Sequence, residues 1–185
     1  SEFMADYITN SKNRKLKKRI ENLISRVGFW AGKLPLSGRF ILLLTGILFL
    51  SLFFPWLELR LSDNSVQRYF AFSQYTGYVG YGILIASIII PFFLLSHTKK
   101  EFVRAYVPFR LSDTQAVVFI ASMIFVALIQ FLFTAGIYNQ IALGGVEIQN
   151  WFFVAITTVL LIIVAGFWLS KNMKKINTEM YYLDH

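Results

Sequence analysis

The stretch TQAVVFIASMIFVALIQFLFTA, Thr114–Ala135, is an apolar run that contains no acidic, basic or histidine side chain. A helix of this length is about 33 Å long, which is enough to cross a hydrocarbon core of roughly 30 Å. Ionisable side chains inside a membrane are costly, and their absence here fits a lipid environment. The run therefore predicts a membrane-spanning helix.

Three further apolar runs resemble the first in length and lie at residues 40–57, 75–96 and 151–170. Hydrophobic residues make up 56% of the chain and charged residues 15%, against about 45–50% and about 25% in soluble domains. The pattern predicts an all-α integral membrane protein, a four-transmembrane-helix bundle that occupies residues 37–175.

The segments outside this domain are polar. Residues 1–3, ahead of Met4, are interpreted as an expression remnant, and no signal peptide is visible. Residues 4–36 are expected to form a cytoplasmic basic amphipathic segment, and residues 176–185 a cytoplasmic tail. The chain has no cysteine, so its sequence says nothing about the redox compartment.

Positive charges predict the orientation. Sixteen of the 18 lysines and arginines lie before the first run, between the second and third, or after the fourth, whereas Arg60 and Arg68 lie on the other side. The positive-inside rule then places both termini in the cytoplasm. The stretch FLSLFFPW, residues 49–56, is similar to small bacterial membrane proteins whose first span ends before Pro-Trp. This resemblance implies a multi-pass protein of a bacterial cytoplasmic membrane.

Apolar residues recur at helical spacing from Leu16 to Leu34, with basic residues on the opposite side. This pattern predicts an interfacial helix on the cytoplasmic headgroups, although the same apolar face would also suit a partner protein. The residues expected to contact anionic inner-leaflet lipid are Lys12, Arg14, Lys15, Lys17, Lys18, Arg19 and Arg26. No nucleic-acid-binding motif accompanies these charges, so no nucleic-acid partner is expected.

Two connections carry strand signals instead. Residues 57–61 alternate in polarity and are followed by the turn sequence SDNS and a second strand-like segment. In QIALGGVEIQ, the pair Gly144-Gly145 predicts another hairpin, with Leu143 opposite Val146 and Ile141 opposite Ile148. These extracytoplasmic β-hairpins are expected to form one small sheet.

Residues able to perform chemistry are few. Gln130 is the polar residue that stands out within the apolar runs, and we expect an interhelical hydrogen bond there rather than a pore- or substrate-facing amide. Glu58, Arg60, Asp63 and Glu147 would form either an outer polar site or solvated rim charges, and the second is favoured. Neither a metal-ligand motif nor a nucleophile motif is present, so we expect no cofactor and no enzymatic activity.

The stretch YTGYVGYG, residues 75–82, contains the core letters of a potassium-channel selectivity filter. Only residues 83–96 follow before the basic loop, and about 21 Å of helix is too short for a separate span. The stretch is therefore interpreted as the outer end of the second run. Residues expected to pack helices closely are Gly77, Gly80, Gly82, Ala86 and Gln130. Expected interface anchors are Trp30, Trp56, Tyr75, Tyr78, Tyr81, Trp151 and Trp168.

The function favoured by these features is a non-enzymatic scaffold or accessory subunit that contacts lipids, a protein partner or further copies of itself. An oligomeric channel or small-solute transporter is the alternative, with Gln130 and the hydroxyl side chains lining its path. An intramembrane enzyme is the third class and the least favoured, because its reactive groups would have to come from the rims.

Overall fold

The computed structural model describes residues 14–25, 32, 34–95, 112–141 and 145–183, and the chain divides into two units with the boundary between Leu34 and Pro35. In the first unit, residues 14–25 form a helix. Its apolar residues Leu16, Ile20, Leu23 and Ile24 are all exposed. The amphipathic pattern is therefore present as a helix over these residues.

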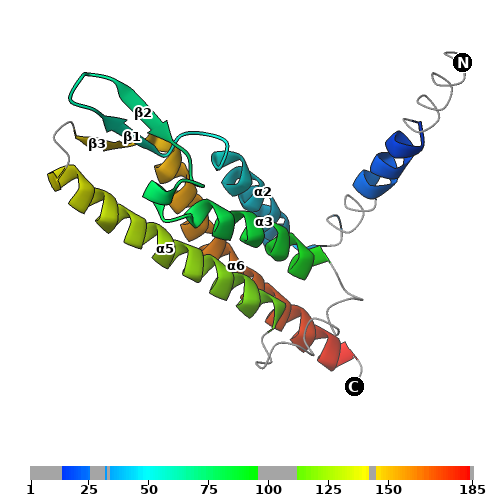
Figure 1. Ribbon diagram of the computed structural model, residues 1–185. Helices are drawn as coiled ribbons and strands as arrows, with labels where there is room; N and C mark the ends of the chain where they lie inside the picture. Colours follow the sequence, from blue (N-terminus) through cyan, green and yellow to red (C-terminus); the bar gives the residue numbers. More distant parts are fainter. Residues whose placement is uncertain (1–13, 26–31, 33, 96–111, 142–144, 184–185) are drawn as a thin grey trace, which may run out of the picture. The chain divides into compact units, whose positions relative to one another are not determined.

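The described part of the second unit contains the helices α2 (Leu36–Ser51), α3 (Val79–Leu95), α5 (Asp113–Ile141) and α6 (Asn150–Leu183). Helix α6 packs against α2 and α5, and α3 packs against the same two helices. A three-stranded sheet lies at one end of these helices, where α5 ends and α6 begins (Figure 1).

The prediction of a four-transmembrane-helix bundle was wrong. Among the described residues, only the stretches Asp113–Ile137 of α5 and Asn150–Lys175 of α6 are long and apolar enough to cross a membrane. Helix α2 has 16 residues and α3 has 17, which correspond to about 24 Å and about 26 Å of helix. Both are shorter than a hydrocarbon core of roughly 30 Å.

The two short helices are short because the chain leaves the helical conformation inside each apolar run. After α2, residues 52–54 form a turn, Pro55 and Trp56 follow outside any helix, and strand β1 begins at Leu57. Before α3, Gln74–Thr76 form the single 3₁₀ turn η1, and Gly77 and Tyr78 then adopt positive φ angles of 65° and 56°. Each apolar run therefore extends beyond the helix that forms within it.

The sheet joins the two connections in the order β2-β1-β3, with β1 (Leu57–Arg60) antiparallel to β2 (Val66–Tyr69) and to β3 (Val146–Ile148). The β1–β2 hairpin turns through SDNS as predicted. The second predicted hairpin was wrong, because Ile141 is the last residue of α5 and Ile148 pairs with Leu57. Leu143 lies outside the described residues.

The junction between the sheet and the helices is a buried aromatic cluster around Trp56. The Trp56 side chain is fully buried, and its Nε1–H donates to the Ser51 carbonyl at 2.9 Å. Its ring meets that of Phe152 edge-on at 5.8 Å, and Phe152 in turn contacts Phe131 of α5. The cluster ties the end of α2 to α5 and α6.

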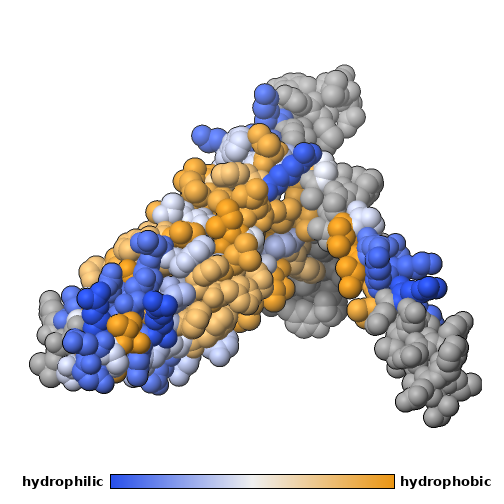
Figure 2. Space-filling view, turned by 90° about the horizontal axis from the view of Figure 1, so that it is seen from above, coloured by the Kyte–Doolittle hydropathy of each residue, from blue (hydrophilic) through white to orange (hydrophobic). Residues whose placement is uncertain are grey.

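Large hydrophobic side chains also cover the outside of the helices. Figure 2 shows them over the helices, while hydrophilic residues gather at the end that carries the β1–β2 hairpin. The exposed set includes Phe40, Leu43, Ile47 and Leu50 on α2, Ile85 and Ile88 on α3, Phe119, Met123, Val126, Phe133 and Ile137 on α5, and Leu160, Leu161, Val164 and Phe167 on α6. Exposed apolar surface on this scale is informative, whereas scattered single residues are not.

Candidate functional site

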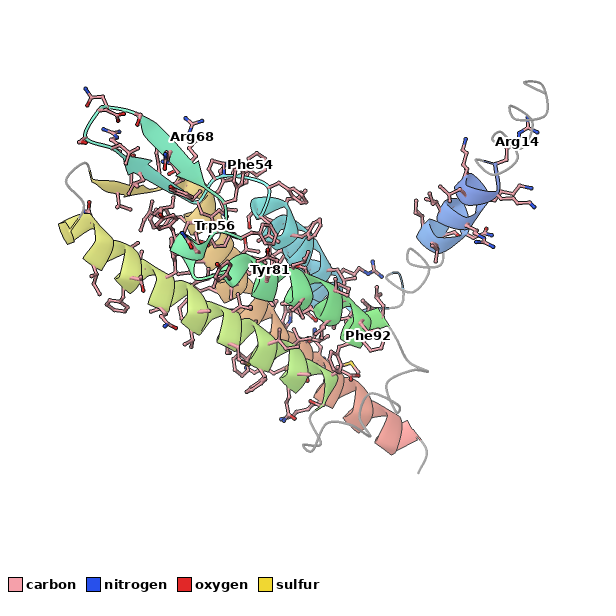
Figure 3. All side chains as sticks on the ribbon, viewed as in Figure 1. Arg14, Phe54, Trp56, Arg68, Tyr81 and Phe92 are labelled. Atoms are coloured by element: carbon pink, nitrogen blue, oxygen red, sulfur yellow. The ribbon has the colours of Figure 1, made fainter. Side chains whose placement is uncertain are left out.

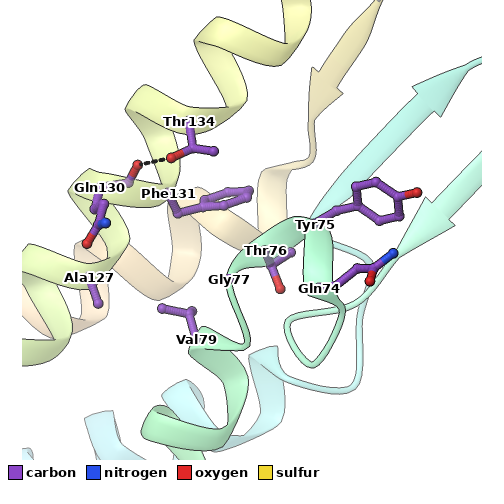
Figure 4. A pocket seen from close by; sticks show the side chains of 9 residues that line it. All are labelled: Gln74, Tyr75, Thr76, Gly77, Val79, Ala127, Gln130, Phe131 and Thr134. Carbon is purple, nitrogen blue, oxygen red and sulfur yellow. Dashed lines mark hydrogen bonds between the residues drawn. The ribbon is translucent and has the colours of Figure 1, made fainter.

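A cavity of about 180 Å³ lies between the turn that precedes α3 and the half of α5 nearer the sheet. Its walls bring together the glycine- and tyrosine-rich stretch and the amide of Gln130, which are far apart in the sequence (Figure 4). The lining residues are Gln74, Tyr75, Thr76, Gly77 and Val79 from the turn and the start of α3, and Ala127, Gln130, Phe131 and Thr134 from α5.

Hydrogen bonds within the chain fix the shape of this turn. Ser73 Oγ accepts from the Tyr75 amide at 3.1 Å, and the buried Thr76 Oγ1 lies 2.7 Å from the Ala71 carbonyl oxygen. Tyr78 has a left-handed conformation that is costly for a residue with a side chain, and its N–H is held by the Ser73 carbonyl at 3.2 Å. Hydrogen bonds to backbone groups of residues 71–78 therefore hold this wall of the cavity in its conformation.

The lining offers neutral hydrogen-bonding groups. Tyr75 is the titratable residue among its nine members, and the remaining polar side chains are amides and hydroxyls. Thr134 Oγ1 donates to the Gln130 carbonyl at 2.9 Å, while the Gln130 side-chain amide has no hydrogen bond to the described part of the chain. In Figure 4, Gln130 projects from α5 on one side, and Gln74 and Tyr75 project from the turn on the other. Amide and hydroxyl groups of this kind can hydrogen-bond neutral polar groups or water.

The residues predicted to pack helices closely occupy different environments. Gly80 lies against Ala71, where an added Cβ would be 2.7 Å from the backbone carbonyl carbon. Gly82 faces Ile124 of α5 with ordinary spacing, and Ala86 is buried. Gly77 is exposed in the turn, and Gln130 is exposed on α5, where it lines the cavity.

The predicted interface anchors also occupy different environments. Tyr75, Tyr78 and Tyr81 are exposed near the sheet end, and Trp168 is 44% exposed on α6. Trp151 stacks on Phe54 with ring centroids 3.9 Å apart. Trp56 is fully buried in the aromatic cluster and lies beneath the hairpin in Figure 3. Trp30 lies outside the described residues.

The predicted contacts with anionic lipid fall mainly on the helix of residues 14–25. Arg14, Lys15, Lys17, Lys18 and Arg19 are all exposed there, with Arg14 labelled in Figure 3. Lys12 and Arg26 lie outside the described residues.

The charged residues of the sheet form two ion pairs. Arg60 Nη2 lies 3.1 Å from Glu147 Oε2, and Arg68 Nε lies 3.4 Å from Glu58 Oε2, which also accepts from Gln149 Nε2 at 3.2 Å. Glu58 thus pairs with Arg68 and not with Arg60. The Arg60–Glu147 pair is exposed, and a pair of this kind contributes roughly 0–1 kcal/mol, whereas the Glu58 side chain of the second pair is only 14% exposed.

Asp63 does not join these pairs. Its Oδ1 accepts from the Ser65 hydroxyl at 2.6 Å and from the Ser65 amide, and these bonds lower the pKa of the carboxyl group. On β2, desolvation raises the pKa of the Tyr69 phenol, and the neighbouring Tyr75 adds to the shift. Across the described ranges, no three His, Asp or Glu side chains converge on a point that would hold a metal ion.

Two features of the site escaped the sequence reasoning. The sequence SQYTG before α3 holds a serine cap and a left-handed glycine, which together signal a turn rather than more helix. Gly166 on α6 packs closely against α5, since an added Cβ there would lie 2.5 Å from Val118 Cγ2. The sequence signal for this close packing was a single glycine within an apolar run.

No protein-family model matches this sequence, and comparisons with curated proteins and with solved structures give no match either.

Proposed function

We propose that this chain is an integral membrane protein that acts without catalysis, as a scaffold or accessory subunit. The observation that carries the proposal is the large hydrophobic surface exposed on α2, α3, α5 and α6. In water such surface costs about 25 cal/mol per Å², whereas lipid chains solvate it. Helices α5 and α6 cross the hydrocarbon core, and α2 and α3 pack beside them with their apolar sides towards lipid.

The distribution of positive charge predicts how this arrangement is oriented across the membrane. Lys171, Lys174 and Lys175 lie on α6 beyond its apolar part, at the opposite end from Arg60 and Arg68 of the sheet. Cytoplasmic segments carry the excess of lysine and arginine. Both termini are therefore cytoplasmic, and the sheet faces outward. The basic helix of residues 14–25 adds attraction to anionic lipid on the inner side.

A protein partner has a suitable surface on the outer side. Strand β2 lies at an edge of the sheet, and its residues Val66, Gln67 and Arg68 are exposed. An edge strand offers unpaired backbone groups to which another strand can add. This edge supports a binding role more directly than the cavity does.

The absence of cysteine makes the membrane orientation directly testable. Single cysteines at Asn64, in the hairpin turn, and at Lys175, on α6, would be labelled with a membrane-impermeant maleimide. We expect Asn64→Cys to react in intact cells and Lys175→Cys to react only after permeabilisation. Alkaline carbonate should leave the protein in the membrane pellet. Release by carbonate, or the reverse labelling pattern, would contradict the proposal.

The scaffold role is tested by cross-linking in native membranes. Val66→Lys places a charge on the edge strand and should abolish a stoichiometric cross-link, whereas Ser62→Lys in the turn should retain it. Purified protein in liposomes should not raise solute flux above that of empty vesicles. A flux that depends on the protein would support the channel alternative instead.

A further inference from the structure

An apolar groove of about 430 Å³ lies between the start of α2 and the cytoplasmic end of the α6 span. Leu36, Arg39, Phe40 and Leu43 line it from α2, and Trp168 lines it from α6. Almost all of its surface is apolar, so Arg39 contributes the aliphatic stem of its side chain. Acyl chains match such a surface.

An interhelical hydrogen bond holds the groove in place. Asn172 Nδ2 donates to Ser37 Oγ at 3.2 Å, and Ser37 is fully buried. Asn172 is one helical turn beyond Trp168, and Ser37 is next to Leu36. This bond fixes the two walls relative to each other, so the groove exists without a ligand.

Arg39 lies in the first turn of α2, at the end of the unit that is remote from the sheet. Side chains on a helix tilt towards the N-terminus of that helix, and α2 begins at this end. Long basic side chains lay their stems on apolar surface while the charged group reaches polar surroundings. Lys171 on α6 is less than one turn from Trp168 and adds positive charge at the same end.

We propose that this groove binds one anionic phospholipid of the cytoplasmic leaflet. One acyl chain lies on Phe40, Leu43 and Trp168, and the phosphate accepts hydrogen bonds from the Arg39 guanidinium. Positive charge at the rim of an apolar groove selects a lipid with a net negative headgroup over a zwitterionic one. This inference rests on the proposed function, because the groove must lie in a bilayer.

Tryptophan quenching by brominated lipid tests the site, since bromine quenches the indole only on close contact. The full-length protein would be reconstituted into phosphatidylcholine vesicles that contain increasing fractions of brominated phosphatidylglycerol or brominated phosphatidylcholine. The Trp168 signal is the difference between the wild type and Trp168→Phe. We expect half-maximal quenching at about a three- to tenfold lower fraction of the anionic lipid.

Charge variants sharpen the test. Arg39→Gln should make the two lipids equally effective, and Arg39→Lys should retain most of the preference. The matched control Arg68→Gln removes the same charge from an exposed residue at the sheet end, and it should quench as the wild type does.

The proposal is overturned if Arg39→Gln keeps the preference or if the wild type shows none. It is also overturned if neither lipid quenches Trp168, because another occupant, such as a second copy of the chain, would then cover the groove. Carbonate extraction separates the two proposals. A protein that stays in the membrane without lipid preference rejects only the groove, whereas a protein that carbonate releases rejects membrane embedding as well.

Discussion

Helices α3 and α5 arise from apolar runs of equal length, at residues 75–96 and 114–135, yet they contain 17 and 29 residues. Part of the difference lies in how each helix starts, because α3 begins four residues inside its run and α5 begins one residue before its run. Helix α5 begins with a reciprocal cap. Ser112 Oγ accepts from the backbone N–H of Gln115, and Gln115 Oε1 accepts from the backbone N–H of Ser112. Helix α3 begins after two left-handed residues, Gly77 and Tyr78. Local backbone conformation and hydrogen bonding, rather than hydropathy, therefore decide where each of these two helices begins.

The largest loss of stability is expected just after the end of α2. Trp56→Ala would empty the buried cluster beneath the sheet and should lower the free energy of unfolding by about 3–5 kcal/mol. Thermal unfolding in detergent would measure the loss. Trp168→Ala is the matched control, because this tryptophan is 44% exposed whereas Trp56 is fully buried, and its loss of stability should be clearly smaller. Equal losses in both variants would show that burial does not distinguish the two positions.

The entry to α3 gives the next largest effect. Gly80→Ala would press a methyl group onto the Ala71 backbone and should destabilise the protein by about 1–3 kcal/mol through overpacking. Gly136→Ala in α5 meets nothing within 4 Å and should be neutral or slightly stabilising, because alanine is the better helix former. A tolerated Gly80→Ala would mean that this turn adapts readily.

The start of α5 gives a smaller effect. Ser112→Ala removes the cap and should cost about 1 kcal/mol. Hydrogen exchange in the first turn of α5 should accelerate, while exchange in α3 should not change. Ser122→Ala is the control, because its hydroxyl donates to the Val118 carbonyl within the same helix. Unchanged exchange in Ser112→Ala would show that packing alone holds the start of α5.

The smallest effect concerns the hairpin turn that follows α2. Hydrogen bonds from Ser65 stabilise the ionised form of Asp63, so its pKa is lower in the folded protein than in the unfolded chain. The stabilisation is present above the unfolded pKa and is lost as the pH falls through the folded pKa. NMR should show the Ser65 amide shift titrating below the ordinary aspartate range. Ser65→Ala should raise the Asp63 pKa, and no rise would contradict the assignment.

Part of the candidate site could be predicted from the sequence. The hairpin turn at SDNS was predicted because aspartate and asparagine favour turns, and Gln130 was noticed because an amide is rare in an apolar run. The partner of Gln130 across the cavity was not predictable, because the turn at Gln74–Gly77 was interpreted as helix. The pairing of β3 with β1 joins residues about ninety positions apart along the chain, and no local pattern specifies such a contact.

Composition and periodicity alone determined that this chain has long apolar helices, a basic amphipathic segment and strand-forming connections, because these properties are local. Tertiary structure decided which apolar residues became helix, which strands paired and where the groove beside Arg39 lies. Trp56 illustrates the reason. Its indole N–H needs an acceptor and its ring needs a packed cavity, and both are met only where α2, β1 and α6 come together.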